Sequence, residues 1–505
     1  MLFLSLVSII LLTYKDYGTI WNEDVFVNSG HYYTRLILNY FKIKNNLAPF
    51  DFFKTYPALG LVHIQTHGVS FDILLFSLMS LFKKFSFENY HLLKALVAVP
   101  TFIFIYLTVR KLTNWKVAAF SFLLLGLFPD FYGNIFNNAI DVQSVLVLSA
   151  AVCSFTYFFL GKQTVFKGFV LAFFLGLCLE QRIIFLYVFL LILLGIFVRE
   201  WLIKKKFVSA FYKSFLLGFF SLIFAHLLHP YLFTHPIFGL FDMMKAARLY
   251  PFTAANLFEG KMYFPPNLPW NYLPKLIFIT TPEATIFLFI IGNFYLLKQI
   301  FTKKTLGKNR FIFFFLLSIM YVPIILTILL KPNIYDSWRQ FLFLTVPIII
   351  IAAFGFLTII KLKTYWLKVC LMLLIAADLL FTAYTFIKLH PYQYVYYNLF
   401  VGGLKGAYRQ YETDYLGAGY KEAVLWFNSH INDPTKTYLI YAEGDRLSSQ
   451  TYFKKNMVFT SDVAKADYIF TFTRWNLDRQ NPGKTVYTVE REGVPLIFIK
   501  QNIHG

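Results

Sequence analysis

Eleven long apolar stretches constrain the fold of this 505-residue chain more than any other feature. An α-helix needs about 20 consecutive apolar residues to cross a bilayer. Only 14% of the residues are charged, against about a quarter in a soluble domain. The sequence therefore predicts a polytopic α-helical membrane protein with about 11 transmembrane helices. These helices are expected near residues 1–14, 93–110, 117–131, 142–160, 165–180, 183–199, 213–229, 274–297, 311–330, 340–360 and 367–387.

The cationic residues are concentrated on one side of the predicted helices. Loops at 110–116, 161–167, 199–213, 298–310 and 361–368 hold 18 Lys and Arg residues and the single carboxylate Glu200. This pattern is the positive-inside asymmetry of membrane proteins, so we expect these loops and the amino terminus to be cytoplasmic. It explains the net charge of +21 without nucleic acid, which we do not expect as a partner. Segments 15–92, 132–141, 180–182, 230–273, 331–339 and the chain after 388 are then expected outside.

The sequence predicts two domains. Residues 1–390 form the transmembrane domain, with a long outer loop at 15–92 in which Ser70–Phe82 is expected to lie as a helix in the membrane interface. Segment 230–273 is expected to be irregular. After Pro391 hydropathy falls and short strand-like runs appear at Thr437–Tyr441, Tyr468–Phe472 and Leu496–Lys500, with a helix at Tyr420–Ser429. Residues 391–505 are therefore predicted to form a small extracytoplasmic α/β domain.

Ionisable side chains at the outer ends of membrane helices are costly, so they are the first candidates for function. Asp141, Arg182, Asp336 and Arg339 stand at three such ends, and Glu23 and Asp24 follow the first helix. In the predicted topology these groups converge on one membrane face. A carboxylate there can remove a proton from an incoming hydroxyl. An arginine can bind a departing phosphate with two parallel hydrogen bonds.

Each candidate also has a purely structural interpretation. Asp141 could cap the helix that follows it. Glu180 and Arg182 could form an ion pair, and Asp336 and Arg339 could be solvated loop charges. Glu23 and Asp24 could likewise be solvated, and His67 could be a hydrogen-bonded structural histidine. The shared sidedness of these groups is what favours a functional site.

Several segments resemble GT-C glycosyltransferases, most closely the bacterial enzymes related to protein O-mannosyltransferases and lipid A aminoarabinose transferases. Trp21-Asn22-Glu23 resembles the family's Asp-Glu motif, and the segment with His67-Gly68 resembles its His-Gly-Pro segment. The resemblance extends from about residue 20 to 430. It runs through Thr66–Asp72, Asn138–Asp141, Glu180–Arg182, Leu268–Tyr272, Thr280–Pro282, Tyr335–Phe343 and His390–Tyr394.

The resemblance implies transfer of a sugar from a polyprenyl-phosphate carrier to an acceptor on the extracytoplasmic face. Glu23 and Asp141 would be the acidic pair, and Arg182 or Arg339 would meet the carrier phosphate. One departure matters, because Asn22 replaces the acidic first member of the motif and an amide cannot accept a proton. The base role then falls to Glu23 or to Asp24. Residues implied in substrate binding are Arg182, Arg339, Asp336, His67, Asn138 and Asn22.

The sequence thus predicts a multi-pass glycosyltransferase of the plasma (cytoplasmic) membrane. Its partners would be a polyprenyl-phosphate sugar donor, the lipid bilayer, and an acceptor that is protein, lipid or glycan. Two alternatives remain at this point: a transporter or flippase of lipid-linked saccharide, and an inactive scaffold that binds the carrier. No metal-ligand cluster is visible and no cofactor is predicted with certainty, although a divalent metal is compatible with the resemblance.

Overall fold

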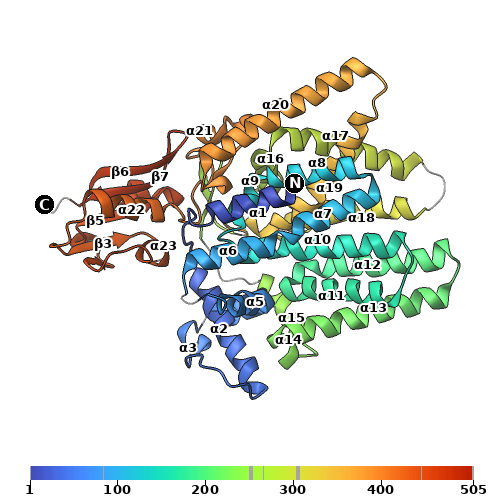
Figure 1. Cartoon of the computed structure of the whole chain (residues 1–505), viewed down its shortest axis with the longest axis horizontal. Helices are drawn as coiled ribbons and strands as arrows, with labels where there is room; N and C mark the ends of the chain where they lie inside the picture. Colours follow the sequence, from blue (N-terminus) through green and yellow to red (C-terminus); the bar gives the residue numbers. More distant parts are fainter. Residues whose placement is uncertain are drawn as a thin grey trace.

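The computed structural model describes residues 2–57, 59–82, 85–248, 254–265, 267–302, 307–444 and 446–502. A bundle of long helices carries a small β-sheet at one end (Figure 1). The bundle comprises residues up to Leu389, and the sheet is built from strands that follow it. The mostly helical membrane architecture predicted from the apolar stretches, with a small sheet region after it, is confirmed.

The helical part begins with α1 and ends with α20. Its elements are α1 (Leu2–Thr13), α2 (Glu23–Tyr40), α3 (Phe52–Thr55), α4 (Leu59–Thr66), α5 (Ser70–Met79), α6 (Phe87–Ala98), α7 (Pro100–Leu112), α8 (Trp115–Gly126), α9 (Pro129–Asn134), α10 (Ala139–Leu160), α11 (Val165–Gln181), η1 (Ile183–Phe185), α12 (Leu186–Val198), η2 (Arg199–Ile203), α13 (Phe207–Leu228), α14 (Pro230–Thr234), α15 (Gly239–Arg248), α16 (Tyr272–Thr280), α17 (Glu283–Thr302), α18 (Lys308–Leu330), η3 (Arg339–Leu344), α19 (Thr345–Ile360) and α20 (Tyr365–Leu389).

Within the described residues, eight helices are long and apolar enough to cross a membrane, or nine if a bent pair counts as one span. That pair is α4 and α5, which meet at 111°. The predicted number of 11 spans stays a prediction, since α1 and α8 are apolar but only 12 residues long. The single helix expected at 274–297 is wrong: α16 ends at Thr280 and α17 begins at Glu283. Pro282 explains the break, because proline disfavours helical backbone in the residue before it.

The outer segments hold more regular structure than the sequence suggested. The 15–92 loop contains α2 to α5 and the start of α6, and the interfacial position of α5 stays a prediction. The irregular segment expected at 230–273 contains α14, α15 and a hairpin of β1 (Asn256–Phe258) and β2 (Lys261–Tyr263). That expectation is therefore corrected for its described part.

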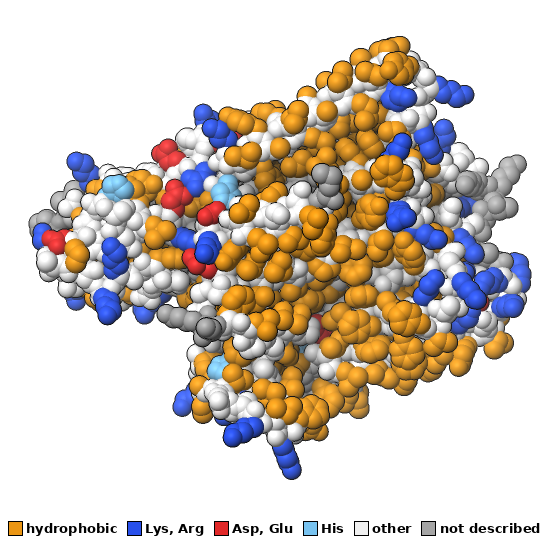
Figure 2. Space-filling model, viewed as in Figure 1, with side chains coloured by type: hydrophobic (Ala, Val, Ile, Leu, Met, Phe, Trp, Pro, Cys, Tyr) orange, Lys and Arg blue, Asp and Glu red, His pale blue; other side chains and the backbone are white. Residues whose placement is uncertain are grey.

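Lys and Arg side chains gather at the end of the bundle farthest from the sheet, as Figure 2 shows. Several belong to the loops that the sequence predicts to be cytoplasmic, although Lys303 and Lys304 of these loops lie outside the described residues. Glu200, the one carboxylate of these loops, pairs with Lys204 (2.7 Å) and Lys213 (3.0 Å). A broad apolar belt separates this basic end from the sheet (Figure 2). The charge asymmetry in the sequence is thus an asymmetry in space.

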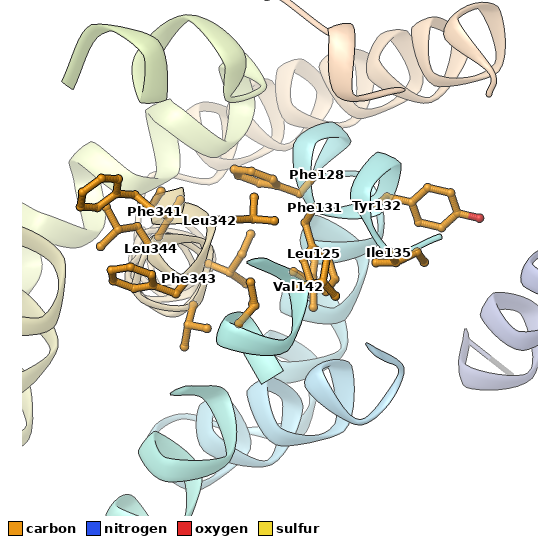
Figure 3. Close-up of a cluster of buried hydrophobic side chains, with 14 of the residues drawn as sticks. Leu125, Phe128, Phe131, Tyr132, Ile135, Val142, Phe341, Leu342, Phe343 and Leu344 are labelled. Carbon is orange, nitrogen blue, oxygen red and sulfur yellow. The ribbon is translucent and has the colours of Figure 1, made fainter. Parts of the chain in front are cut away.

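Close packing holds η3 and α19 in place. In α17 and α19, a Cβ added at Gly292 would collide with the backbone oxygen of Ile351, and one at Gly355 with that of Leu288. Small residues of this kind let membrane helices approach backbone to backbone. Phe341–Leu344 of η3 belong to one buried cluster with side chains of α8, α9 and α10 (Figure 3). Helix α19 is therefore packed closely against α17, and η3 ahead of it against α8, α9 and α10.

The C-terminal sheet has five strands in the order β4-β3-β5-β7-β6. Strand β3 (Tyr438–Ala442) pairs in parallel with β4 (Met457–Phe459) and β5 (Tyr468–Phe472), while β7 (Val494–Gln501) is antiparallel to β5 and β6 (Lys484–Arg491). The predicted helix corresponds to α22 (Tyr420–His430), and the three predicted strands to β3, β5 and β7. The shorter elements are η4 (Gln393–Val395), η5 (Leu399–Val401), α21 (Gly403–Ala407), α23 (Arg446–Gln450), η6 (Val463–Lys465), η7 (Arg474–Asn476) and α24 (Leu477–Gln480).

Candidate functional site

Asp141 is the centre of a cluster of charged side chains between the bundle and the sheet. It lies in the first turn of α10, is buried, and forms ion pairs with Arg182 and with Arg339 (2.8 Å). Asn138 donates a hydrogen bond to its carboxylate (2.7 Å). Asn138 also caps α10, because its side-chain oxygen accepts from the Asp141 amide (3.2 Å). The cap is therefore Asn138 and not Asp141, which leaves the Asp141 carboxylate to hold two guanidiniums.

Asp336 extends the cluster toward the C-terminal region. One carboxylate oxygen accepts from Arg339 at 2.8 and 3.2 Å, and the other pairs with Arg474. The sequence predicted that the charged groups at the helix ends converge on one face together with Glu23 and Asp24. The structure brings Asp141, Arg182, Asp336 and Arg339 into one cluster of ion pairs, which does not include Glu23. They are not solvated loop charges, and Arg182 pairs with Asp141 and not with Glu180.

The backbone around the cluster adopts left-handed conformations at residues other than glycine. Asn22 has φ of 57°, Asp336 and Ser337 have 58° and 61°, and Trp475 and Asn476 have 53° and 55°. Such conformations cost about 1–3 kcal/mol each and persist only where the surrounding structure imposes them. Three segments far apart in sequence therefore carry the same kind of strain at one place.

Two cavities flank the cluster. One has a volume of 130 Å³, and its lining includes Trp21, Asn22, Asn138, Asp336, Arg339 and Arg474. The other, of 160 Å³, is lined by residues that include Arg182 and Gln340. His67 and Tyr335 line both. The ring of His67 is hydrogen-bonded to Thr66 Oγ1 (2.7 Å). The arginine side chains thus face space that a ligand can occupy.

A third cavity, of 290 Å³, adjoins the second. The two share Pro332 and Ile334 in their walls. The third is lined mainly by apolar side chains, among them Trp270, with Thr327 and Lys331 as polar members. An amphiphile with an anionic head would find apolar walls here and guanidinium groups farther in.

Glu23 occupies a different position from that expected for a catalytic base. Its carboxylate is fully buried, pairs with Lys94, and lies 2.9 Å from Nε2 of His91. The Ile20 amide donates to it as well (3.1 Å). Burial raises the pKa of Glu23, but His91 and Lys94 outweigh burial and hold that pKa below its usual value. Glu23 does not line either cavity.

Asp24 and Asn22 flank Glu23 and are more accessible. Asp24 is half-buried and accepts a hydrogen bond from Tyr56 (2.7 Å). Asn22 precedes α2 in its left-handed conformation and lines the 130 Å³ cavity. Among the described residues, no group of three or more His, Cys, Asp or Glu side chains could hold a metal ion.

Residues 67–229 match the family model for dolichyl-phosphate-mannose-protein mannosyltransferase. No curated protein matches the chain. A solved structure of the archaeal oligosaccharyltransferase AglB from Archaeoglobus fulgidus, in complex with an inhibitory peptide and a dolichol-phosphate, superposes with a TM-score of 0.50 at 11% identity. The match covers 93% of this chain and 69% of AglB. This chain has the fold of the GT-C membrane glycosyltransferases.

A second GT-C structure, ArnT from Cupriavidus metallidurans bound to undecaprenyl phosphate, matches with a TM-score of 0.48 at 9% identity. That match covers 99% of this chain and 97% of ArnT. The family-model match and the AglB superposition confirm the resemblance noted from the motifs at the level of the GT-C fold. Within the chain, the family-matched segment carries His67, Asp141 and Arg182, whereas Asp336, Arg339 and Arg474 lie beyond it.

Arg474 is the one member of the cluster that the sequence did not reveal. It lies between β5 and β6, in a region whose residues gave no sign of a contact with the bundle. Only the dipeptide Arg474-Trp475 could have drawn attention to it.

Proposed function

We propose that this protein transfers a sugar from a polyprenyl-phosphate-linked donor to an acceptor on the extracytoplasmic face of the plasma membrane. The observation that carries the proposal is the cluster of Arg182 and Arg339 around Asp141, flanked by two cavities that these arginines line. The cavity beside Arg182 shares wall residues with a third, mainly apolar cavity. A lipid phosphate needs cationic side chains around its phosphate and apolar walls around its lipid chain. The family model for a dolichyl-phosphate-mannose transferase supports the same chemistry.

The arginines are suited to the phosphate of the donor. A guanidinium binds phosphate with two parallel hydrogen bonds and keeps its charge at any physiological pH. Arg182 and Arg339 both pair with the carboxylate of Asp141, and Arg339 also pairs with Asp336. The leaving phosphate gains negative charge as the glycosidic bond breaks, so these fixed cations stabilise the transition state more than the ground state.

We assign the base that takes the acceptor proton to Asp24. Glu23 and Asp141 are buried and held by cations. Asp24 is half-buried, and although it lines neither cavity itself, Asn22 and Val25 on either side of the Glu23-Asp24 pair line the 130 Å³ cavity. A base must come within about 3 Å of the hydroxyl it deprotonates. In this proposal Glu23 holds the loop in place through Lys94, and Asn138 and His67 contact the sugar or its phosphate.

The orientation follows from the charge distribution. Basic loops gather at the end of the bundle away from the sheet, and the positive-inside rule places such loops in the cytoplasm. The cluster and the C-terminal region then lie on the extracytoplasmic side. The two-domain division at residues 390 and 391 is part of this proposal.

The proposal is tested with membranes that contain the full chain and a panel of labelled undecaprenyl-phosphate hexoses and pentoses. Loss of label from the carrier measures transfer. We expect Asp24→Asn to lower the rate by at least about 10²-fold, the usual contribution of a general base. Asp51→Asn is the matched control, since Asp51 is exposed and caps the short helix α3. No turnover of any donor, or unchanged turnover in Asp24→Asn, would contradict the proposal or its base, respectively.

A further inference from the structure

We propose that Arg474, supplied by the C-terminal region, is a positioning residue of the transferase site that acts through Asp336 on Arg339. The inference rests on the proposed function and adds a residue to it. It makes the C-terminal region part of the phosphate-binding apparatus and not only an appended domain.

The contacts of Arg474 are those of a fixed side chain. It is buried, with 2% of its side chain exposed. One end of its guanidinium pairs with Asp336, and the other donates to the carbonyl of Tyr415 (3.1 Å). The guanidinium carbon lies 4.6 Å from the ring centroid of Trp21 and 4.3 Å from that of Trp475. The two indoles meet edge to face, with centroids 6.0 Å apart, and the cation lies against both. A planar cation held in this way has little freedom, so it can define the position of a carboxylate.

Trp21 makes the reciprocal contact. Its ring leaves the bundle and packs on two glycines of the C-terminal region, Gly417 and Gly444, both with positive φ. A Cβ at Gly417 would come within 2.8 Å of the indole nitrogen, and one at Gly444 would collide with the ring. Each part of the chain therefore inserts one aromatic or cationic side chain into the other, beside the 130 Å³ cavity that both line.

The backbone strain lies on both sides of this contact. Asp336 and Ser337 are left-handed on one side, and Trp475 and Asn476 on the other. A docking contact between two domains does not require strained backbone at both partners. Strain that meets at one ion pair indicates that the placement of the Asp336 carboxylate matters.

The electrostatics explain what the placement achieves. Asp336 divides its two oxygens between Arg474 and Arg339. Without Arg474, the whole carboxylate charge would fall on Arg339, which Asp141 already holds (2.8 Å). Arg339 would then be drawn toward carboxylates and away from a ligand phosphate. With Arg474 present, Arg339 keeps its orientation and part of its positive field toward the cavity.

The test is a double-mutant cycle on the affinity of the purified full chain for undecaprenyl phosphate. We expect Arg474→Met to weaken binding about tenfold in the wild-type background, within the usual range of coupling between contacting residues. In an Asp336→Asn background the same change should cost less than about twofold. Arg474→Lys keeps the charge but cannot bridge Asp336 and the Tyr415 carbonyl, so we expect it to behave like Arg474→Met.

Arg491→Met is the matched control. Arg491 also belongs to the C-terminal region, pairs with Glu422 (2.6 Å), donates to the carbonyl of His390 (2.9 Å) and lies 4.6 Å from the Tyr392 ring, but it lines neither cavity. The Arg491→Met variant should have lower thermal stability than the wild type but the same affinity for undecaprenyl phosphate. Wild-type affinity in Arg474→Lys, or equal losses from Arg474→Met in both backgrounds, would overturn the positioning role. A wild type that binds no polyprenyl phosphate would instead overturn the proposed function.

Discussion

Replacing Glu23 by glutamine should destabilise the protein, because Glu23 neutralises a lysine inside the bundle. Its carboxylate has no exposed area, and it pairs with Lys94, whose side chain is 2% exposed. Breaking a buried ion pair by removing one partner costs about 3–5 kcal/mol. Lys94 keeps its hydrogen bond to the carbonyl of Asn137 (3.0 Å) and its position 4.7 Å from the Tyr90 ring. These remaining contacts place the cost near the lower end, at about 3 kcal/mol.

The measurement is the thermal unfolding midpoint of the purified full chain in detergent. Unfolding entropy of about 2.1 cal/mol/K per residue converts the loss into a fall in Tm of about 3 °C for a chain of this length. The fall will be larger if the membrane helices stay helical on unfolding, because less entropy is then gained. Glu88→Gln serves as the control, since Glu88 is 43% exposed and its pair with Lys421 spans 3.5 Å. An exposed pair of that kind is worth at most about 1 kcal/mol.

The double variant Glu23→Gln/Lys94→Met separates charge from packing. It removes both ions at once, so we expect it to be more stable than Glu23→Gln alone. If Glu23→Gln unfolds at the wild-type temperature, the buried pair does not stabilise the protein. The same holds if the stability losses of the single variants Glu23→Gln and Lys94→Met simply add in the double variant.

Three further predictions concern other residues. Asp141→Asn removes the carboxylate that holds both arginines. Undecaprenyl phosphate should then bind about 15-fold more tightly, because a unit charge roughly 10 Å away contributes about 1.7 kcal/mol at an effective dielectric of about 20. Transfer should fall because the guanidiniums lose their orientation, and weaker binding would contradict this. Burial raises the pKa of Glu412 to about 7, above its value of about 4.3 in an unfolded chain. The folded state therefore holds the proton more tightly, and the ionised group destabilises the protein most above pH 7. Glu412→Gln should raise Tm at pH 8 but not at pH 4, and an equal Tm difference at both pH values would refute this pKa. Trp338→Phe removes the indole donor to Asp130 and Thr280 (both 2.8 Å) and should cost about 1–3 kcal/mol in thermal unfolding, whereas Trp366→Phe, at a ring that is 67% exposed, should cost nothing measurable.

Much of the membrane architecture could be predicted because hydropathy reports directly on the bilayer. The breaks inside it could not be located as well. Helices α16 and α17 are separated at Pro282, and η3 precedes α19 as a 3₁₀ turn, although the sequence predicts one helix across each region. Lys94 lay within a predicted span, and a charge at that depth was a signal that it needs a partner.

In the C-terminal region, the three strands found from sequence are the ones with the most apolar residues. The others are missed for identifiable reasons. Strand β4 has only three residues, and β6 is an edge strand whose side chains are mostly polar and partly exposed. Short or half-exposed strands give little periodicity.

The charged cluster divides in the same way. Asp141, Arg182 and Arg339 could be grouped from sequence because the membrane forces helix ends with the same sidedness together. Arg474 could not, since its contact with Asp336 spans 138 positions and depends on how the sheet docks. The pairing of Glu23 with Lys94, and not with a substrate hydroxyl, likewise depends on side-chain direction that a motif does not carry.

The backbone contact between α17 and α19 has a consequence for how far this protein can vary. Because Gly292 and Gly355 each face a carbonyl oxygen, neither position has room for a methyl group without separating the two helices. Arg339 is the first residue of η3, which leads directly into α19, so such a separation would shift the arginine relative to Asp141 on α10. Two buried glycines therefore control the geometry of a charged cluster that they do not contact. A substitution at either glycine is expected to affect the position of Arg339 as well as helix packing.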